Sequence, residues 1–445
     1  MKANVHSRVA IAALAVIATA LMSGCSSGTP DLAATDADGI PEVQVRFANE
    51  PYFDHSQSII GTEKGYVKDV GITLDPSPSG ATVNSSDLVS IFASESYDVV
   101  SASAQLLLPA AKTLPPFKIF SIADIFQGYA VMAQPDAGYS SVEEFEAQGQ
   151  DPSEAIASAI KQLEGKRFVY PADAVIKGFI DQALSAADLT VGDVQSMVTD
   201  ESQTVQAMEA GNADFQVGGV PSHLSLESAG FKSILTSGDL AKMAKPSADS
   251  AELTAVFHDG WVATDKWLDA NHDTALRLAS VSLRINQMIN DSPDEALAIH
   301  TPFLNSIAGT DFDVETGKAA YETLNPFLTF EDLDSTFNDS SNPLNEQYVL
   351  GAAIKQVEAD GVFDEGEYAV SNFTVAGKIY GELQKLKGQA ESDIATVEAA
   401  IAAGEVDDEA GAQSAIDKAK QYNGYFDFLD GARFATEAIT YVTSK

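Results

Sequence analysis

Short β-rich runs alternate with helical patterns from about Glu42 onward, and this alternation limits the possible folds more than any other feature of the chain. Val43 to Ala48 is predicted to be the first strand, a helix follows from about His55 to Lys64, and Ile72 to Leu74 is the next strand. Strand and helix units in succession are typical of mainly parallel sheets covered by helices. We therefore expect an α/β fold.

The same alternation continues well beyond the first two strands. Further strands are predicted at 97–101, 118–122, 129–133, 167–170, 214–217, 231–235 and 253–257. Residues 261–400 are mostly helical, with apolar side chains at near-helical spacing. A chain of 445 residues is expected to form two or three domains, at roughly 150 residues per domain.

The last part of the chain, 374–445, is predicted to form a helical hairpin. Apolar residues recur on two arms, and Gly404 to Glu409 would be the turn between them. The apolar positions are Ile379, Leu383, Leu386, Ile394, Val397 and Ile401 on the first arm, then Ile416, Phe426, Leu429, Phe434 and Ile439 on the second. We expect this hairpin to pack on the body of the protein as a brace.

The first 24 residues are typical of a bacterial secretory signal. Lys2 and Arg8 precede an apolar run from Val9 to Ala20, and Ser23 and Gly24 come just before Cys25. These last three residues resemble a lipobox, which implies cleavage before Cys25, lipidation of its thiol and acylation of the new amine. A signal without lipid and a short membrane anchor are the alternatives, although the apolar segment is shorter than the roughly 20 residues that span a bilayer.

The residues after Cys25 are small and polar, with Gly and Pro among them, so 25–41 is predicted to be a flexible tether. The mature protein is then expected on the extracytoplasmic face of the cell membrane, held there by its lipid. Cys25 is the single cysteine, which excludes an intrachain disulfide, a zinc site built on cysteines and an iron–sulfur cluster.

The charge balance is strongly acidic, with 65 Asp and Glu against 26 Lys and Arg and a formal net charge of −39. A nucleic-acid-binding protein needs the opposite sign of charge, so that class is excluded.

Several segments resemble a known family. Asn49 to His55, followed by Glu63 to Ile72, looks like the start of the substrate-binding proteins of ABC importers in the nitrate, sulfonate, taurine and thiamine-precursor group. Later segments fall in the order that this family uses, and the resemblance covers roughly residues 42–385. These later segments are Phe92 to Val100, Leu163 to Arg167, Ala207 to Asp214 and Trp261 to Thr264.

The resemblance implies a type II periplasmic binding protein, in which two α/β lobes are joined by two crossing strands and the ligand lies between them. Lobe 1 would be formed by 42–128 and 246–373, and lobe 2 by 129–245. Such a protein captures a small molecule and delivers it to an ABC permease that is powered by a separate ATPase. It would act as a monomer, without catalysis and without a cofactor.

Candidate ligand residues follow from the geometry of open α/β sheets, whose ligands lie outside the carboxyl ends of the strands. Five loops meet this condition, at 50–55, 79–82, 102–105, 171–174 and 217–222. The predicted ligand-binding residues, including aromatic residues for stacking, are Glu50, Tyr52, Phe53, His55, Thr82, Ser103, Gln105, Asp173, Gly219 and Trp261.

The charges near the predicted cleft favour one class of ligand. Glu50, Asp54 and Asp173 are near it and no Arg is. His55 lies where the resemblance is to the thiamine-precursor binders, so we expect a small nitrogen heterocycle, such as a thiamine-precursor pyrimidine, or a similar neutral to cationic molecule. A sulfonate or nitrate is the alternative, because helix N-termini and hydroxyl groups can hold an anion without Arg.

Two other functions stay open: an extracellular enzyme built on the same fold, and a cell-surface sensor or scaffold that recruits a partner through the hairpin. The sequence contains no Gly-x-Ser-x-Gly, His-Glu-x-x-His or phosphate-loop motif. No metal site is expected either. Asp311, Asp313, Glu315 and Glu322 have calcium-loop spacing, but Gly317 is at position seven of that loop instead of six. His223, His258, His272 and His300 show no metal-ligand spacing.

Overall fold

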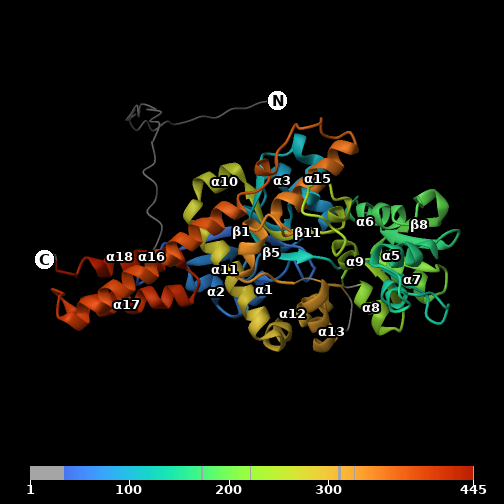
Figure 1. Cartoon of the computed structure of the whole chain (residues 1–445). Helices are drawn as coiled ribbons and strands as arrows, with labels where there is room; N and C mark the ends of the chain where they lie inside the picture. The colour runs from blue at the N-terminus through green and yellow to red at the C-terminus, as the bar shows by residue number, and fades with distance from the viewer. Residues whose placement is uncertain (1–34, 172–173, 221, 309–311, 325, 444–445) are drawn as a thin grey trace, which may run out of the picture.

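The computed structural model describes residues 35–171, 174–220, 222–308, 312–324 and 326–443. Two α/β lobes lie side by side, and a long helical extension projects from the first lobe on the side away from the second (Figure 1). The expected α/β class with two lobes is confirmed. Among the described residues, no helix combines the length and the apolar character that crossing a membrane requires.

The first lobe is built on a six-stranded sheet with the order β2-β1-β4-β11-β5, in which β3 pairs with β1. The strands are β1 (Val43–Asn49), β2 (Ile72–Asp75), β3 (Ala81–Thr82), β4 (Val99–Ser103), β5 (Phe117–Phe126) and β11 (Phe257–Thr264). β1 is parallel to β2, β3 and β4, whereas β11 is antiparallel to both β4 and β5. The chain therefore returns to the first sheet after building the second.

Helices surround this first sheet. They are α1 (Ser58–Glu63), α2 (Tyr66–Asp69), α3 (Leu88–Ser94), α10 (Asp265–Ala270), α11 (His272–Asp291), α12 (Pro293–Ala308), α13 (Val314–Ala319), α14 (Asp332–Phe337) and α15 (Glu346–Ala359). α11 is buried along most of its length, and Asn286 on it donates hydrogen bonds to the carbonyls of Ala123 (2.7 Å) and Leu328 (2.8 Å). These two bonds fix the helix against β5 and the following loops.

The second lobe is built on a five-stranded sheet with the order β10-β6-β9-β7-β8. The strands are β6 (Ala130–Ala133), β7 (Arg167–Pro171), β8 (Gln195–Thr199), β9 (Phe215–Gly218) and β10 (Lys232–Thr236). The helices are α4 (Val142–Ala147), α5 (Pro152–Lys161), α6 (Ala174–Ser185), α7 (Glu201–Glu209), α8 (Ser222–Ser228) and α9 (Ser237–Ala241). The chain passes between the two sheets at 127–129 and again at 242–256.

Some predicted elements differ from the structure. The strand expected at 253–257 is a 3-10 helix at Ala251–Ala255, and the strand begins only at Phe257 and runs through residues expected to start the helical region. β11 carries Asp259 and Gly260 inside its apolar run, which hides it from a search for β-branched segments. The helix expected from His55 begins at Ser58, because 51–55 form turns.

The C-terminal extension has three helices instead of the two expected arms. α16 (Ala376–Ala403) is the first arm, but the second is divided into α17 (Glu409–Gly424) and α18 (Phe428–Ile439). Phe426 has a φ of 64° between them, a left-handed conformation that ends the helix. The chain reverses there, so that Val406 before α17 pairs with Val442 after α18.

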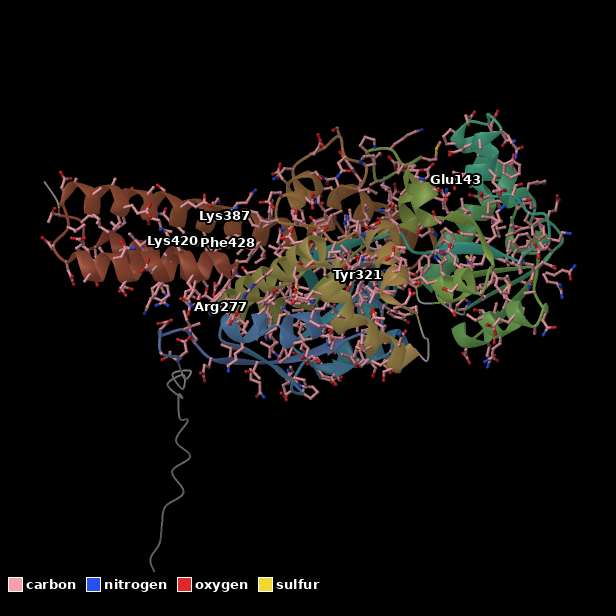
Figure 2. The ribbon with its side chains drawn as sticks, turned by 90° about the horizontal axis from the view of Figure 1, so that it is seen from below. Glu143, Arg277, Tyr321, Lys387, Lys420 and Phe428 are labelled. Carbon is pink, nitrogen blue, oxygen red and sulfur yellow. The ribbon has the colours of Figure 1, made fainter. Side chains whose placement is uncertain are left out.

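Among the described residues, the extension packs on the first lobe through its base, which is where a brace would act. Phe428 contacts Phe330 with ring centroids 5.2 Å apart, and the ammonium of Lys387 lies 4.9 Å from the centre of the Phe330 ring. Beside them, Arg277 of α11 pairs with Asp430 of α18 at 2.8 Å. Figure 2 shows Arg277, Lys387 and Phe428 near this junction.

The segment just before β1 is fixed against the extension. Ile40 is fully buried in the apolar cluster of the three helices, and the carboxylate of Asp38 pairs with Lys418 at 2.7 Å. Residues 35–41 are therefore not part of a flexible tether, contrary to the prediction. The predicted signal, Cys25 and the rest of the tether lie outside the described residues.

Candidate functional site

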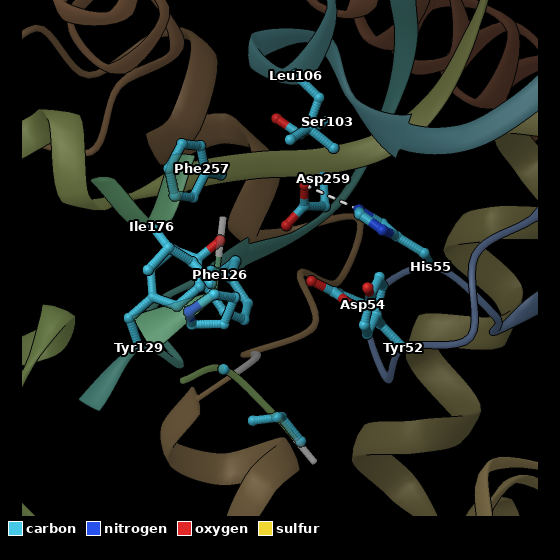
Figure 3. A pocket seen from close by; sticks show the side chains of 13 residues that line it. Tyr52, Asp54, His55, Ser103, Leu106, Phe126, Tyr129, Ile176, Phe257 and Asp259 are labelled. Carbon is cyan, nitrogen blue, oxygen red and sulfur yellow. Dashed lines mark ion pairs between the residues drawn. The ribbon is translucent and has the colours of Figure 1, made fainter. Parts of the chain in front are cut away.

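A pocket lies between the two lobes, with a cavity volume of about 100 Å³. Its walls come from both lobes and from the segment that joins them. The lining residues are Tyr52, Asp54, His55, Ser103, Leu106, Phe126, Tyr129, Pro171, Ile176, Gly219, Val220, Phe257 and Asp259 (Figure 3).

Three strands of the first sheet place the polar side of the pocket. The loop that follows β1 supplies Tyr52, Asp54 and His55, and β4 ends at Ser103. β11 is antiparallel to β4, and the register places Asp259 directly opposite Ser103. Asp259 therefore lies at the carboxyl ends of the parallel strands, although it comes from the first half of its own strand.

His55 lies between two carboxylates. Its Nδ1 atom is 3.0 Å from Oε2 of Glu50, and its Nε2 atom is 3.1 Å from Oδ1 of Asp259. Both carboxylates are almost fully buried, and Asp54, which is 6% exposed, completes the group. We call Glu50, Asp54, His55 and Asp259 the acidic corner of the pocket.

The electrostatics of the acidic corner follow from burial and charge. Burial by itself lowers the pKa of His55, but the carboxylates of Asp54, Asp259 and Glu50 together raise it well above its usual range. The pKa of Asp54 is also raised, to about 7, mainly because the carboxyl group is buried. His55 lowers this pKa, and the neighbouring carboxylate of Asp259 raises it further. The corner holds three carboxyl groups and one imidazole, and the described lining of the pocket includes no Lys or Arg.

Aromatic rings form the opposite wall. The rings of Phe126 and Tyr129 meet edge to face with centroids 4.7 Å apart, and Phe257 lies 6.2 Å from Phe126 and 6.0 Å from Tyr129. Figure 3 shows these three side chains across the pocket from Asp54 and His55. Such a wall is suited to the flat face of a ring, while the corner is suited to positive charge or to N–H donors.

Residues 38–299 match the NMT1-like family, which is more than half of the chain. The chain belongs to the NMT1-like family. The match includes every strand of both sheets and ends before the C-terminal extension. No curated protein sequence matches that of this NMT1-like chain.

Solved structures of binding proteins share the fold. The periplasmic sulfonate-binding protein SsuA of Methylobacillus flagellatus KT is 14% identical, with a TM-score of 0.56 over 78% of this chain and 95% of its own. The aliphatic sulphonate-binding protein SsuA of Escherichia coli is 11% identical, with a TM-score of 0.51 over 75% and 91%. The nitrate-binding protein NrtA of Synechocystis PCC 6803 is 12% identical, with a TM-score of 0.51 over 76% and 87%.

The structure brings together part of the predicted ligand set. Tyr52, His55, Ser103 and Gly219 line the pocket, and Glu50 lies behind His55. Their contact with a ligand stays a prediction.

The other predicted residues lie elsewhere. Gln105 is buried and donates its backbone N–H to Ser103, but it faces a separate hollow beside Leu108. Thr82 is exposed on β3 and does not line the pocket. Asp173 lies outside the described residues.

The structure does not support the prediction that Phe53 and Trp261 stack on a ligand. Each is only 1% exposed, so neither ring offers a face for stacking a ligand. Phe53 packs on Phe312 with ring centroids 5.2 Å apart, and Trp261 meets Phe47 at the same distance. Both residues are part of the core of the first lobe, because the loop and the strand that carry them direct these rings inward.

The aromatic wall and Asp259 were not predicted from the sequence. Phe126, Tyr129 and Phe257 lie where the chain passes between the lobes, and their apolar character makes them look like core residues. Asp259 did have a signal, because it is an acidic residue inside an otherwise apolar strand. Asp54 was predicted only as a charge near the cleft, although it lines the pocket.

Proposed function

We propose that this chain is the extracytoplasmic solute-binding component of an ABC importer, which captures a small molecule between its two lobes and delivers it to a permease with a separate ATPase. The observation that carries the proposal is the pocket itself, whose lining comes from both lobes at the place where the chain passes between them. Closure of the lobes would bury the solute and create the surface that a permease recognises. The structural neighbours SsuA and NrtA, named as periplasmic binding proteins, support the same role.

The solute we propose is a small nitrogen heterocycle, such as a thiamine-precursor pyrimidine, or another neutral to cationic ring. The ring would stack on Phe126, Tyr129 and Phe257, and its N–H groups would face Asp54 and Asp259. A sulfonate or nitrate is the second candidate, because SsuA and NrtA are named for these anions. The acidic corner argues against it, since an anion beside buried carboxylates is repelled.

The chain acts without catalysis in this proposal, as a monomer held to the membrane by lipid on Cys25. An enzyme on the same fold would convert the solute that it binds. The acidic corner contains groups that could move a proton, so the distinction is made by what happens to the bound molecule and not by the residues alone.

The test is calorimetric titration of the purified chain with pyrimidines, flavins, polyamines, sulfonates and nitrate, followed by mass spectrometry of the recovered compound. We expect binding of a heterocycle that is recovered unchanged. Asp259→Asn should weaken this binding, and Asp249→Asn should not, because Asp249 is exposed, pairs with Lys355 and does not line the pocket. Recovery of an altered compound would identify an enzyme, and tight binding of an anion with no heterocycle bound would overturn the proposed solute class.

A further inference from the structure

Three potential metal ligands meet in the acidic corner. Asp54, His55 and Asp259 each offer one ligand atom, and these atoms all lie within 4.8 Å of one another. Two ligand atoms on one zinc-sized ion are at most about 4 Å apart, since each bond is about 2.0–2.2 Å. The ligand atoms would therefore have to move closer together to share one ion. Each of the three residues is at most 6% exposed.

Glu50 gives this group a second, independent feature. Its carboxylate is fully buried and lies 3.0 Å from Nδ1 of His55, on the far side of the ring from Asp259. Metal-binding histidines generally donate the N–H that does not face the metal to such a partner. With a proton on Nδ1, loss of the proton from Nε2 would leave the lone pair of Nε2 directed toward Asp259, where the metal would lie, since a histidine ligand must be deprotonated at the atom that binds the metal.

Charge supports the same arrangement. Three buried carboxylates face one imidazole, and isolated buried charges are costly unless an opposite charge compensates them. The described lining of the pocket contains no Lys or Arg that could do so. A divalent cation between Asp54, His55 and Asp259 would offset two of the three negative charges that the ionised carboxylates of the acidic corner can carry.

We propose that Asp54, His55 and Asp259 bind one divalent first-row metal ion, with Nε2 of His55 and one oxygen of each carboxylate as its ligands. The mixed imidazole and carboxylate set suits zinc, iron, nickel or manganese better than a metal that prefers sulfur. In Figure 3 the carboxylates of Asp54 and Asp259 lie in the same pocket as the aromatic rings. The remaining positions of the metal would therefore face the solute, and a ring nitrogen could complete the coordination. The metal site itself does not depend on which solute is carried.

The experiment is calorimetric titration of the whole chain with Zn²⁺ after treatment with a chelator. Physiological salt and excess Mg²⁺ suppress weak binding to the many surface carboxylates. We expect one Zn²⁺ per chain in the wild type, and no saturable site in His55→Gln or Asp259→Asn. Co²⁺ added to the wild type should give visible absorption bands that Zn²⁺ displaces.

Two further variants separate the proposed site from other causes. Glu50→Gln should keep one metal ion per chain but weaken its binding by about 10- to 100-fold, as changes to a partner of a metal ligand do. His223→Gln should bind the metal like the wild type, because His223 is an equally buried histidine that pairs with Glu227 in the second lobe. Circular dichroism checks that each variant is folded.

Failure to bind Zn²⁺ by the folded wild type would overturn the metal site, and so would binding that survives equally in His55→Gln and Asp259→Asn. The solute titrations are repeated with and without the metal. A solute that binds the metal-free protein, together with no metal binding, overturns the metal site and leaves the proposed function intact. Metal binding with no effect of any solute supports the site and counts against the proposed solute class.

Discussion

Two buried charged clusters in this molecule differ in how their charges are balanced. At the base of the extension, Asp430 accepts a hydrogen bond from Nε of Arg277 at 2.9 Å and another from Nε of Arg433 at the same distance. In the acidic corner, three carboxyl groups share one histidine. In the first cluster two arginines balance the buried carboxylates within the protein, whereas the second opens into a pocket, where a cation or N–H donors from outside can reach it. We therefore expect the first cluster to serve stability and the second to serve binding.

The largest expected effect on stability comes from breaking the charged cluster at the base of the extension, which we call the balanced cluster. Arg277→Met leaves Asp430, which is 1% exposed, without its buried partner, and we expect a loss of about 3–5 kcal/mol in the free energy of unfolding. Urea denaturation measures it. The matched control is Arg46→Met, which removes a surface pair with Asp98 and should cost at most about 1 kcal/mol. Equal losses in the two variants would remove the distinction between buried and surface pairs.

The balanced cluster should also give the protein a dependence on pH. Burial, with the nearby Asp430, raises the pKa of Asp427 to about 8, although Arg277 lowers it. The unfolded value is about 3.9. The folded state therefore holds a proton that the unfolded state releases, so this contribution to stability is complete below about pH 4 and is lost as the pH rises through 8.

Asp427→Asn removes this titration. Relative to the variant, the wild type should lose stability at up to about 1.4 kcal/mol per pH unit between these two values. Urea denaturation of both proteins across this range gives the difference. Asn can still accept the hydrogen bond that Asp427 receives from the N–H of Asp430, so the helix cap is retained. A difference that does not change with pH would contradict the assignment.

Asp259→Asn is the matching change in the acidic corner, and we expect it to change solute binding more than stability. It removes a carboxylate from a group with excess negative charge, so the free energy of unfolding should stay within about 1 kcal/mol of the wild type or rise. The affinity for the solute should fall at least about tenfold, which is about 1.4 kcal/mol. Denaturation and calorimetry on the same sample measure both. A large loss of stability with unchanged affinity would make the acidic corner structural.

The smallest expected effect concerns aromatic rings in the two regions. Phe257→Leu removes one ring of the pocket wall and should weaken solute binding by about 0.5–1.5 kcal/mol. Phe330→Leu removes a ring at the base of the extension, where it packs on Phe428, and should lower stability without changing affinity. Calorimetry and urea denaturation of both variants make the comparison. Equal effects of the two variants on affinity would mean that the wall does not contact the solute.

Much of the fold could be predicted from the sequence because it depends on local patterns. The first strand was expected at Val43 to Ala48 and is found at Val43–Asn49, and four loops expected at the ligand site, 50–55, 102–105, 171–174 and 217–222, do contribute residues to the pocket. The residues at which a strand ends can be recognised from the sequence pattern. The carboxyl ends of parallel strands meet at one edge, so the position of the pocket follows.

The remainder depends on long-range pairing that no local pattern contains. Asp259 enters the site only because β11 inserts antiparallel between β4 and β5. Phe53 and Tyr52 are neighbours in one loop, yet one is core and the other lines the pocket, and the apolar partners that enclose Phe53 come from far along the chain. The reversal at Phe426 similarly depends on a left-handed conformation at a non-glycine residue, which the sequence pattern does not reveal.

The central claim is that the pocket between the lobes binds a neutral to cationic ring through its acidic corner. Thermal unfolding tests it most directly, with the wild type and Asp259→Asn each heated with a cationic heterocycle and with a sulfonate built on a similar ring. At 100 times its dissociation constant the heterocycle should stabilise the wild type by about 2.7 kcal/mol, and Asp259→Asn by less. Stabilisation by the sulfonate alone, or equal stabilisation of the two proteins by the heterocycle, would contradict the account.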